Sequence, residues 1–369
     1  MTNYEELSDE ELMNLYLENR AIISHKHNEQ MSIKIQINSL YGALANIYFT
    51  YYNLNIAEAI TTSGQLSLRW AMNAINAYMN KILKTENVDY AIYGDTDSCY
   101  VSAKALIEEV FGTSDISKEE GEKFLDEFFA TNIQKLLDKE YDFLSQRLNA
   151  YGNHMHMGRE KICDRAVFTG KKRYILNVLN SEGVHYDIPK ISVTGIESVR
   201  SSTPDICREK FDEAFKIIMN GNEKEIQKFI SDFRAEFKTL SAEDIARNTS
   251  ANDIKKYEMK TEPFYIKGTP QHIRGSILYN KELKNLGLEK TRDAINPGDK
   301  VKLIYLNMPN PIRENVIAFP QMLPKEFGLE KYIDYDLQFE KVFLDPLVAI
   351  LRIIGWQHKE IANLEQFFT

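Results

Sequence analysis

Apolar residues recur every three or four positions through the first part of the chain, which is the spacing of helices. This pattern predicts helices over residues 8–31 and 32–46, and Ser8 followed by Glu11 forms a capping-box pattern at the start of the first. Residues 54–84 predict one long helix. Its candidate core residues are Ile56, Ile60, Leu66, Trp70, Ile75 and Ile82.

The period changes at residue 89. Aromatic and β-branched residues flank Gly-Asp-Thr-Asp in residues 89–103, which predicts a strand, a turn and a second strand. Residues 117–149 predict charged helix. Residues 165–200 predict a small antiparallel sheet made from the segments FTGKKRYILNVLN, VHYDIP and ISVTGIES.

A domain boundary is expected near residues 201–204, Ser-Ser-Thr-Pro. Residues 205–255 predict mostly helix, with an apolar stripe typical of a core. The stripe consists of Phe211, Phe215, Ile218, Phe229, Phe233 and Phe237. Eight of the ten prolines lie from Pro263 onward, so residues 260–325 predict loops and short strands before a final helix over 334–353. The fold class that follows is α+β.

The composition restricts the class of protein. The chain has 369 residues and is 43% hydrophobic, which is typical of a globular protein of two or three domains. It contains no uninterrupted apolar run long enough to span a membrane, and its acidic N-terminus is no signal peptide. The three cysteines, Cys99, Cys163 and Cys207, lack CxxC spacing, so reduced thiols and a cytoplasmic location are expected.

The net charge of −9 argues against bulk attraction to nucleic acid, but the charge is uneven. From Arg159 to Arg200 there are eight Lys or Arg residues against five acidic ones. A basic strip of this kind on an acidic protein is able to follow a phosphate backbone.

Two aspartates, Asp95 and Asp97, lie at positions i and i+2 in the predicted hairpin. On extended backbone this spacing projects both side chains to the same side. Carboxylates held so close together repel each other, and a divalent cation with a preference for hard oxygen ligands removes that cost. The motif therefore predicts part of a magnesium site, although an ordinary Asp-rich turn remains an alternative.

Lys34, Asn38 and Tyr41 share one face of the predicted helix over 32–46, at i, i+4 and i+7. Lys34 is suited to phosphate oxygens as a point charge, and Tyr41 offers a ring and a hydroxyl to a base or sugar. Gly42 follows and allows close approach to the backbone. A solvated amphipathic helix is the alternative interpretation.

Together these motifs resemble the family B (α-like) DNA polymerases, in particular the T-even-type bacteriophage replicative enzymes. Five motifs occur in the family's order. They are K-x3-N-S-x-Y-G at 34–42, YGDTDS, TGKKRY at 169–174, GIESVRSSTP at 195–204 and HIRGSILYN at 272–280. The resemblance implies a helical fingers part over 1–46, an antiparallel-sheet palm over 47–203, a mostly helical thumb over 204–355 and a clamp-binding tail over 356–369.

The resemblance also implies roles for the motif residues in template-directed DNA synthesis with two Mg²⁺ ions. Lys34 is expected to contact the incoming dNTP, while Asn38 and Tyr41 lie against the nucleotide and the nascent base pair. Asp97 is expected to ligate metal directly, with Asp95 ordering the metals. Glu160 matches a palm carboxylate near the metals, but related phage enzymes tend to have Asp where Gly158 stands.

Contacts with primer–template DNA and with a sliding clamp are implied for residues further along the chain. Lys172 is the best candidate for the duplex, and its neighbours Lys171, Arg173 and Tyr174 support it, with a solvated basic turn as the alternative. His272 and Arg274 are the candidates in the thumb, where a structural role for His272 is equally compatible. Leu364, Phe367 and Phe368 resemble a clamp-docking peptide, the alternative being a helix end folded back on the thumb.

The family's D-x-x-S-L-Y-P motif, which carries a metal-bridging aspartate, is missing: no proline here follows a tyrosine. Acidic exonuclease motifs are missing too. The chain is therefore expected to be the C-terminal part of a polymerase, either a subunit completed by an N-terminal partner or a truncated fragment, and to be inactive alone.

Two other classes remain as alternatives. A DNA-binding or scaffolding fragment without turnover would need none of the retained motif residues. A palm-domain nucleotidyl cyclase also uses hairpin carboxylates, but it gives no account of the KKRY strip or the long thumb-like region. Dependence on a primer separates a polymerase from a cyclase.

Overall fold

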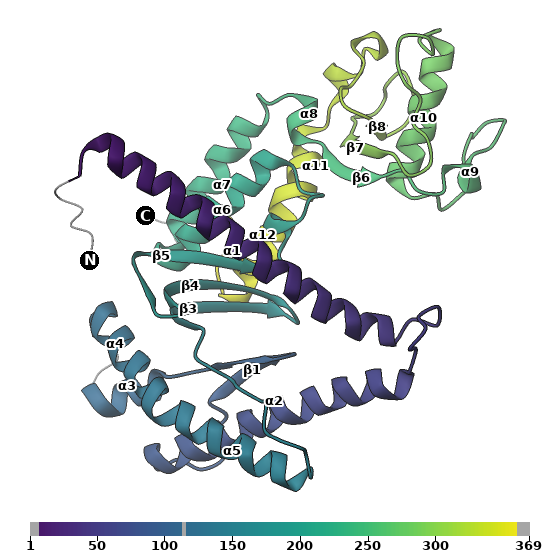
Figure 1. Ribbon diagram of the computed structural model, residues 1–369. Helices are drawn as coiled ribbons and strands as arrows, with labels where there is room; N and C mark the ends of the chain where they lie inside the picture. The colour runs from purple at the N-terminus through teal and green to yellow at the C-terminus, as the bar shows by residue number, and fades with distance from the viewer. Residues whose placement is uncertain (1–6, 113–115, 360–369) are drawn as a thin grey trace, which may run out of the picture. The chain divides into compact units, whose positions relative to one another are not determined.

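A computed structural model describes residues 7–112 and 116–359 of the chain. The chain forms two compact units, Met1–Ile116 with Glu127–Gly158, and Ser117–Asp126 with Arg159–Thr369. All strand pairs described are antiparallel and form small sheets among many helices (Figure 1). The predicted α+β class is therefore confirmed.

The first unit begins with a single long helix, α1 (Asp9–Leu44). Ser8 caps it, and Glu11 completes the predicted capping box. The prediction of two helices meeting at residue 31 was wrong. Residues 24–36 contain neither Gly nor Pro, so nothing in that stretch ends a helix.

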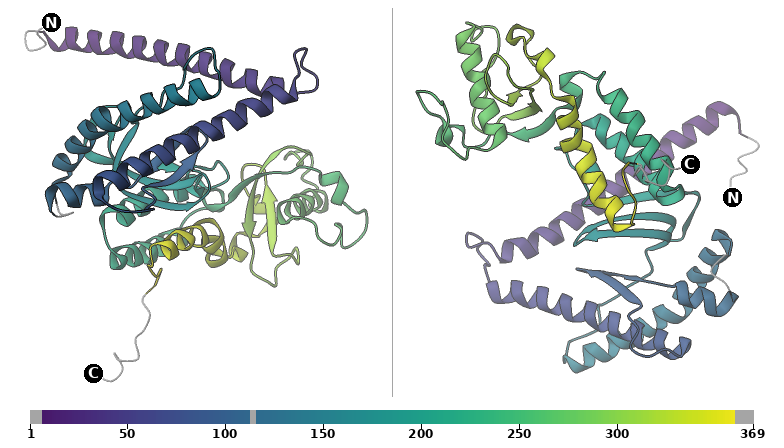
Figure 2. Two further views of the ribbon diagram at one scale, coloured as in Figure 1. Left: turned by 90° about the horizontal axis from the view of Figure 1, so that it is seen from below. Right: turned by 180° about the vertical axis from the view of Figure 1, so that it is seen from behind.

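Helix α2 (Leu54–Leu83) follows, as predicted, and diverges from α1 at the connecting loop (Figure 2). Its buried stripe is Ser67, Ala71, Ile75 and Met79, spaced four residues apart. Trp70 and Ile82 are half-buried, but the other three expected core residues, Ile56, Ile60 and Leu66, are exposed. The apolar spacing in the first half of α2 correctly predicted a helix. It did not predict burial, because few of the described residues pack against these side chains.

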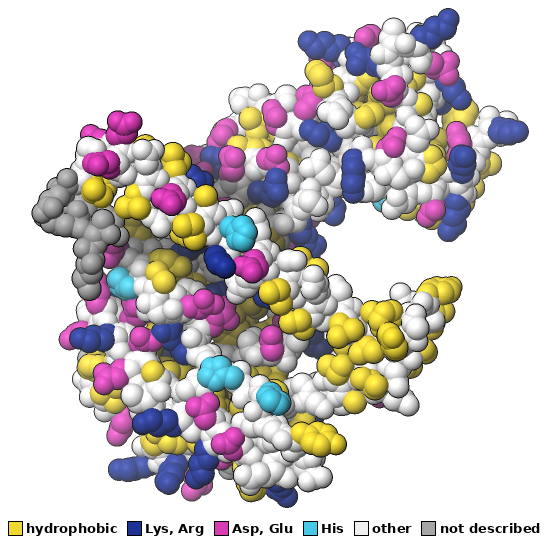
Figure 3. Space-filling view, viewed as in Figure 1, with side chains coloured by type: hydrophobic (Ala, Val, Ile, Leu, Met, Phe, Trp, Pro, Cys, Tyr) yellow, Lys and Arg dark blue, Asp and Glu magenta, His cyan; other side chains and the backbone are white. Residues whose placement is uncertain are grey.

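Apolar side chains gather where α1 meets α2, and Figure 3 shows them as a continuous area on the face drawn. We call this area the tip patch. It consists of Ile47, Tyr48, Tyr51, Tyr52, Leu54, Ile56 and Ile60. Tyr48 is 89% exposed and Tyr51 74% exposed. Exposed apolar areas of this kind mark interaction surfaces.

The rest of the first unit forms the platform beneath a β-hairpin. Strands β1 (Ala91–Asp95) and β2 (Ser98–Val101) pair as predicted and lead into α3 (Lys104–Phe111). The predicted helix over 117–149 is confirmed as α4 (Lys118–Phe128), a π-helical turn (Phe129–Ile133) and α5 (Gln134–Arg147). Most of α4 belongs to the second unit, whereas the π-helical turn and α5 belong to the first. Trp70 of α2 donates from its indole nitrogen to Glu140 of α5 over 3.0 Å.

The second unit is built on the sheet β3 (Lys161–Gly170), β4 (Arg173–Ser181) and β5 (Val184–Thr194), in that order. The central strand β4 is buried over residues 175–180. The segments VHYDIP and ISVTGIES, expected as separate pieces, are joined through residue 194 in the single strand β5. Pro189 lies where the β4–β5 register shifts, between the pairs Val178–Lys190 and Asn180–His185, so its missing N–H costs no ladder bond.

Helices α6 (Asp205–Asn220) and α7 (Glu223–Phe237) bury the predicted aromatic stripe. The ring centroids of Phe211 and Phe343 are 4.8 Å apart, as are those of Phe233 and Phe343. Phe343 lies in the predicted final helix. That helix is confirmed as α11 (Tyr335–Phe339), a π-helical turn (Glu340–Leu344) and α12 (Asp345–Ile353). Of the stripe, Phe229 alone is half-buried rather than buried.

The remainder of the second unit differs from prediction at two places. Residues 205–255 include the short strand β6 (Arg247–Ser250) beside the short helices α8 (Ala242–Ile245) and α9 (Ile254–Tyr257). Residues 260–325 include the 15-residue helix α10 (Gln271–Asn285) as well as strands β7 (Lys300–Tyr305) and β8 (Val316–Phe319). The prolines misled the prediction because Pro270 caps α10 and the next proline is Pro297, so none interrupts it.

Short 3₁₀ turns complete the fold at Glu197–Val199, Lys325–Phe327 and Glu330–Tyr332. No helix of the described residues is both long and apolar enough to cross a membrane.

Candidate functional site

The two aspartates lie at the turn of the β1–β2 hairpin. Asp95 ends β1 and pairs with Ser98, and the backbone N–H of Asp97 donates to the carbonyl of Asp95 over 2.7 Å. Thr96, between them, has a φ of 58°, a left-handed conformation that is uncommon for a β-branched residue. The aspartates therefore flank a tight turn and do not lie on the extended backbone expected for an i, i+2 pair.

Side chains around the turn reinforce its shape. The Thr96 hydroxyl donates to Asp95 Oδ1 over 2.8 Å, and the Ser98 hydroxyl donates to the Asp95 carbonyl over 3.2 Å. Asp95 is half-buried and Asp97 is exposed. The hairpin thus presents the Asp97 carboxylate outward from a constrained turn.

Two asparagines of α2, which the sequence analysis missed, fix the entry to β1. Asn76 Oδ1 accepts the backbone N–H groups of Tyr90 and Ala91 over 2.9 and 2.8 Å. Asn80 accepts the N–H of Val88 and donates to its carbonyl, over 3.1 and 2.8 Å. Asparagines four residues apart on an apolar helix were the available signal, because paired polar groups on a packed face need partners.

Lys34, Asn38 and Tyr41 all lie on α1 and are exposed, so their predicted helical face exists. None of the three makes a hydrogen bond or ion pair within the part of the chain that the structure describes. A Cβ at Gly42 would have no neighbouring atom within 4 Å, which leaves open space beside the backbone.

Glu160 directly precedes β3 and is exposed, with Lys161 Nζ 3.6 Å from its Oε1. It belongs to the second unit, whereas the aspartate hairpin belongs to the first. Among residues 7–112 and 116–359, no group of three or more His, Cys, Asp or Glu side chains is arranged to hold a metal ion. The hairpin aspartates fit part of a metal site, since they offer two carboxylates, but they do not complete one.

The KKRY motif forms the turn between β3 and β4. Gly170 pairs with Arg173, so Lys171 and Lys172 occupy the exposed tip. Arg173 and Tyr174 are half-buried; the Tyr174 ring lies 5.8 Å from that of Phe168. Arg173 donates to Glu197 of the GIESVR motif, so two of the five motifs meet in the fold.

The thumb candidates sit at the start of α10. Arg274 donates to Asn315 over 2.6 Å, approaches Glu314 at 3.7 Å and lies over the Tyr265 ring at 5.7 Å. Its side chain is only 21% exposed, so these internal contacts occupy most of it. His272 is half-buried. Burial, followed by the charge of Arg247, lowers its pKa.

All three cysteines are free thiols, as predicted, and burial raises the pKa of each. It raises the pKa of Cys207 to about 12 and that of Cys163 to about 11. Burial raises the pKa of Cys99 as well. All three therefore stay protonated near neutral pH and behave as small apolar residues.

The clamp candidates Leu364, Phe367 and Phe368 lie outside the described residues.

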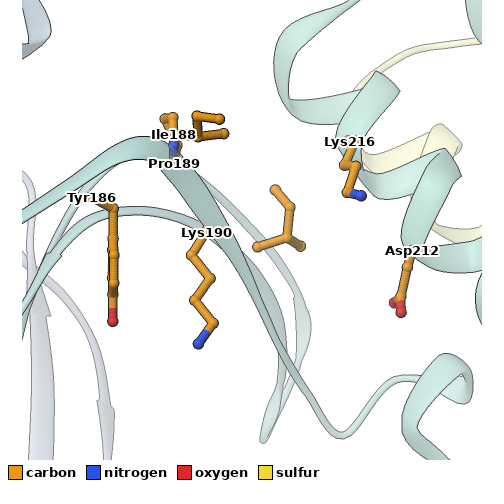
Figure 4. A pocket seen from close by; sticks show the side chains of 7 residues that line it. Tyr186, Ile188, Pro189, Lys190, Asp212 and Lys216 are labelled. Atoms are coloured by element: carbon orange, nitrogen blue, oxygen red, sulfur yellow. The ribbon is translucent and has the colours of Figure 1, made fainter. Parts of the chain in front are cut away.

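An open hollow of about 400 Å³ lies between β5 and α6 (Figure 4). Lys190 of β5 and Lys216 of α6 face it from opposite sides, and Tyr186 and Asp212 contribute to its wall. Burial raises the pKa of Asp212, and the charge of Lys216 opposes that shift. None of the motif residues lines this hollow.

Comparison with known proteins identifies the family. Residues 16–353 match the model of DNA polymerase family B, and the chain belongs to that family. It is 35% identical over 356 residues to the DNA-directed DNA polymerase of Enterobacteria phage T4, covering 93% of this chain and 39% of that protein. It is 34% identical over 352 residues to the DNA-directed DNA polymerase of Escherichia phage RB69, covering 92% of this chain and 38% of that one.

A more distant relative is DNA polymerase 1 of Aeropyrum pernix, 24% identical over 317 residues, or 81% of this chain and 27% of that protein. The chain thus spans about two fifths of the length of the phage relatives it matches. The predicted resemblance to family B polymerases of T-even-type phages is confirmed.

Proposed function

We propose that this chain forms part of the active site of a template-directed DNA polymerase that extends a primer in the 5′–3′ direction. The observation that carries the proposal is the constrained hairpin of Asp95 and Asp97 in a chain of DNA polymerase family B. The substrates are primer–template DNA and dNTPs. Lys34, with its free ammonium group on an exposed helix face, binds the triphosphate as a point charge.

Asn38 and Tyr41 continue that face and bind the nucleotide and the nascent base pair. The open space at Gly42 lets the substrate approach the backbone of α1. Lys171 and Lys172, at the exposed tip of their turn, contact the backbone of the product duplex, which requires charge but no reading of the base sequence. His272 is a further candidate for the duplex, whereas the internal contacts of Arg274 favour a structural role.

Asp97 and Asp95, with Glu160, are the residues proposed to hold two Mg²⁺ ions, because carboxylate oxygens are the ligands that Mg²⁺ prefers. When bound, such ions activate the primer 3′-hydroxyl and neutralise charge on the triphosphate and the leaving pyrophosphate. The sequence lacks a Tyr-Pro dipeptide, and with it the family motif that carries a bridging aspartate. A further carboxylate must therefore come from polypeptide outside these residues.

We further propose that this polypeptide is an N-terminal subunit carrying the exonuclease and the rest of the palm. Two observations support a partner of this kind. The chain matches only about two fifths of the phage relatives. The tip patch and α1 leave large apolar side chains in water, and no residue of α1, a helix described from end to end, is buried.

Primer extension tests the proposal. Tagged chain isolated from its native source with whatever accompanies it should extend a primed template, whereas chain produced alone should not. Extension by the lone chain would overturn the requirement for a partner. An immunoblot of the native source adds a second test: a band at 42.8 kDa supports a separate subunit, and a much larger band shows a fragment of one long polymerase.

A complex that binds primer–template but never extends it would instead favour a DNA-binding or scaffolding role. Extension that requires a primer would exclude a nucleotidyl cyclase.

A further inference from the structure

The turn that presents Lys171 and Lys172 lies against the segment that follows β5. Tyr174 of β4 pairs with Thr194 of β5, so the chain leaves β5 beside the turn and enters Gly195. Gly195 has a φ of 66°, a left-handed conformation that favours glycine. A Cβ at this position would overlap the carbonyl oxygen of Lys172 and lie 3.3 Å from Arg173 Cγ. The backbone of the turn therefore rests directly on the backbone of Gly195.

Two residues later, Glu197 holds the same turn through its side chain. Arg173 Nη2 donates to both carboxylate oxygens of Glu197, over 3.0 and 2.8 Å. Arg200 Nη1 lies 3.5 Å from Glu197 Oε1 and adds a second positive charge. The Glu197 side chain is 20% exposed, which limits screening of these charges by water.

The backbone of Glu197 is also held in place. It begins the 3₁₀ turn Glu197–Val199, and its carbonyl accepts the hydroxyl of Thr203 over 2.8 Å. Arg173 is thereby committed to a carboxylate and contributes little free charge to a ligand. Lys171 and Lys172 form the exposed tip of the turn.

We propose that Gly195 and Glu197 are positioning residues that fix the Lys171–Lys172 turn for contact with the phosphates of a nucleic-acid duplex. Neither residue touches the duplex itself. The proposal rests on the proposed function, since it takes the turn as a duplex-binding element. Fixing the turn in advance reduces the conformational entropy that binding would otherwise remove.

Substitution of Glu197 separates positioning from simple electrostatics, because the two predict opposite signs. Glu197→Gln removes a negative charge near the duplex, which by charge alone should tighten binding. Positioning predicts weaker binding and a shallower dependence of log K on log salt, by about 0.7–0.9 for each phosphate that the turn no longer neutralises. Asp187→Asn removes a fully exposed carboxylate from β5 of the same sheet and is the matched control, with no weakening expected.

The measurement is the fluorescence anisotropy of a labelled primer–template duplex titrated with the full chain at several salt concentrations. Glu197→Asp keeps the charge and should recover part of the affinity. Unchanged or tighter binding by Glu197→Gln, with an unchanged salt slope, would overturn the proposal.

Limited trypsin digestion separates this inference from the function on which it rests. Trypsin cleaves after lysine, so release of the turn in Glu197→Gln should raise the rate of cleavage after Lys171 and Lys172 severalfold, while far-UV circular dichroism stays unchanged. An unchanged cleavage rate would overturn positioning. Should Lys171→Ala with Lys172→Ala leave duplex affinity intact, the duplex-binding role of the turn would fail instead, whatever the digestion shows.

Discussion

The side-chain oxygen of Asn76 accepts the backbone N–H of Ala91 over 2.8 Å, which joins helix α2 to the first residue of the aspartate hairpin. The same oxygen accepts the N–H of Tyr90, and the Asn76 amide donates to Asp89 over 2.9 Å. One side chain thus satisfies three polar groups at the base of β1. This anchor lies at the start of the hairpin that carries Asp95 and Asp97.

Replacing Asn76 by Ala should destabilise the chain by about 1–3 kcal/mol, because two backbone N–H groups lose their acceptor. It should also slow primer extension by the assembled enzyme, since the aspartates lose their support. Urea unfolding and extension rates provide the measurements. Asn73→Ala, an exposed asparagine one turn earlier on α2, is the control and should change stability by less than about 0.5 kcal/mol. Equal destabilisation by the two variants would contradict the anchor.

Asp97→Ala should reduce nucleotide incorporation by the assembled enzyme to below a few per cent, because it removes the proposed direct metal ligand from the turn. The control is Asp232→Ala, which removes an exposed aspartate of α7 and should preserve the rate. Primer extension with both variants at equal complex concentration decides the matter. More than a few per cent of wild-type activity in Asp97→Ala would refute the assignment.

Two helical glycines should respond to alanine in opposite directions. A Cβ at Gly64 of α2 meets no atom within 4 Å, so Gly64→Ala should stabilise the chain by about 0.5–1 kcal/mol. A Cβ at Gly275 of α10 would lie 2.6 Å from the backbone nitrogen of Ala318, and backbone cannot move aside as a side chain can. Gly275→Ala should therefore cost about 1–3 kcal/mol. Denaturant midpoints of the two variants check the signs.

Acidification should weaken the fold through His272. Its pKa is lowered below 6.5, chiefly by burial, so the unfolded chain takes up this proton before the folded chain does. Stability from neutral His272 is complete above pH 6.5 and is lost as the pH falls toward the lower, folded pKa. His272→Gln should lose less stability than the wild type between about pH 7.5 and about pH 5.5. His25→Gln, on the exposed helix α1, should follow the wild type.

Deletion of residues 363–369 tests the predicted clamp-binding tail. The deletion should reduce synthesis stimulated by a sliding clamp and leave basal primer extension unchanged, because none of the residues proposed to bind nucleotide, metal or duplex lies within 363–369. Equal reduction of basal and stimulated synthesis would count against the clamp interpretation. The experiment requires the assembled enzyme and the clamp from the same source.

Local sequence patterns correctly predicted most of the secondary structure. The capping box of Ser8 and Glu11, the aromatic stripe of α6 and α7, and the hairpin around Asp95 follow from residues a few positions apart, and each is present in the fold. Proline density, by contrast, was a poor guide to residues 260–325, because prolines that flank a helix do not prevent it.

Relationships across long stretches of sequence were beyond prediction from periodicity. Asn76 meets Ala91 and Arg173 meets Glu197 only because strands and helices fold back on one another. The exposure of Ile56 and Ile60 was equally hidden: an apolar helical stripe specifies a face that needs covering, but not whether the same chain supplies the cover. The roles of Lys34, Asn38 and Tyr41 also remain predictions, because their exposed face of α1 does not by itself show what binds to it.

If the proposed N-terminal subunit covers the tip patch, the fate of this chain in a cell depends on the supply of that subunit. Tyrosine and isoleucine side chains left in water favour self-association, and chaperones and proteases act on surfaces of this kind. Copies synthesised in excess of the partner would therefore aggregate or be degraded. Balanced synthesis of the two polypeptides, not the affinity of either for DNA, would then set how much enzyme is assembled.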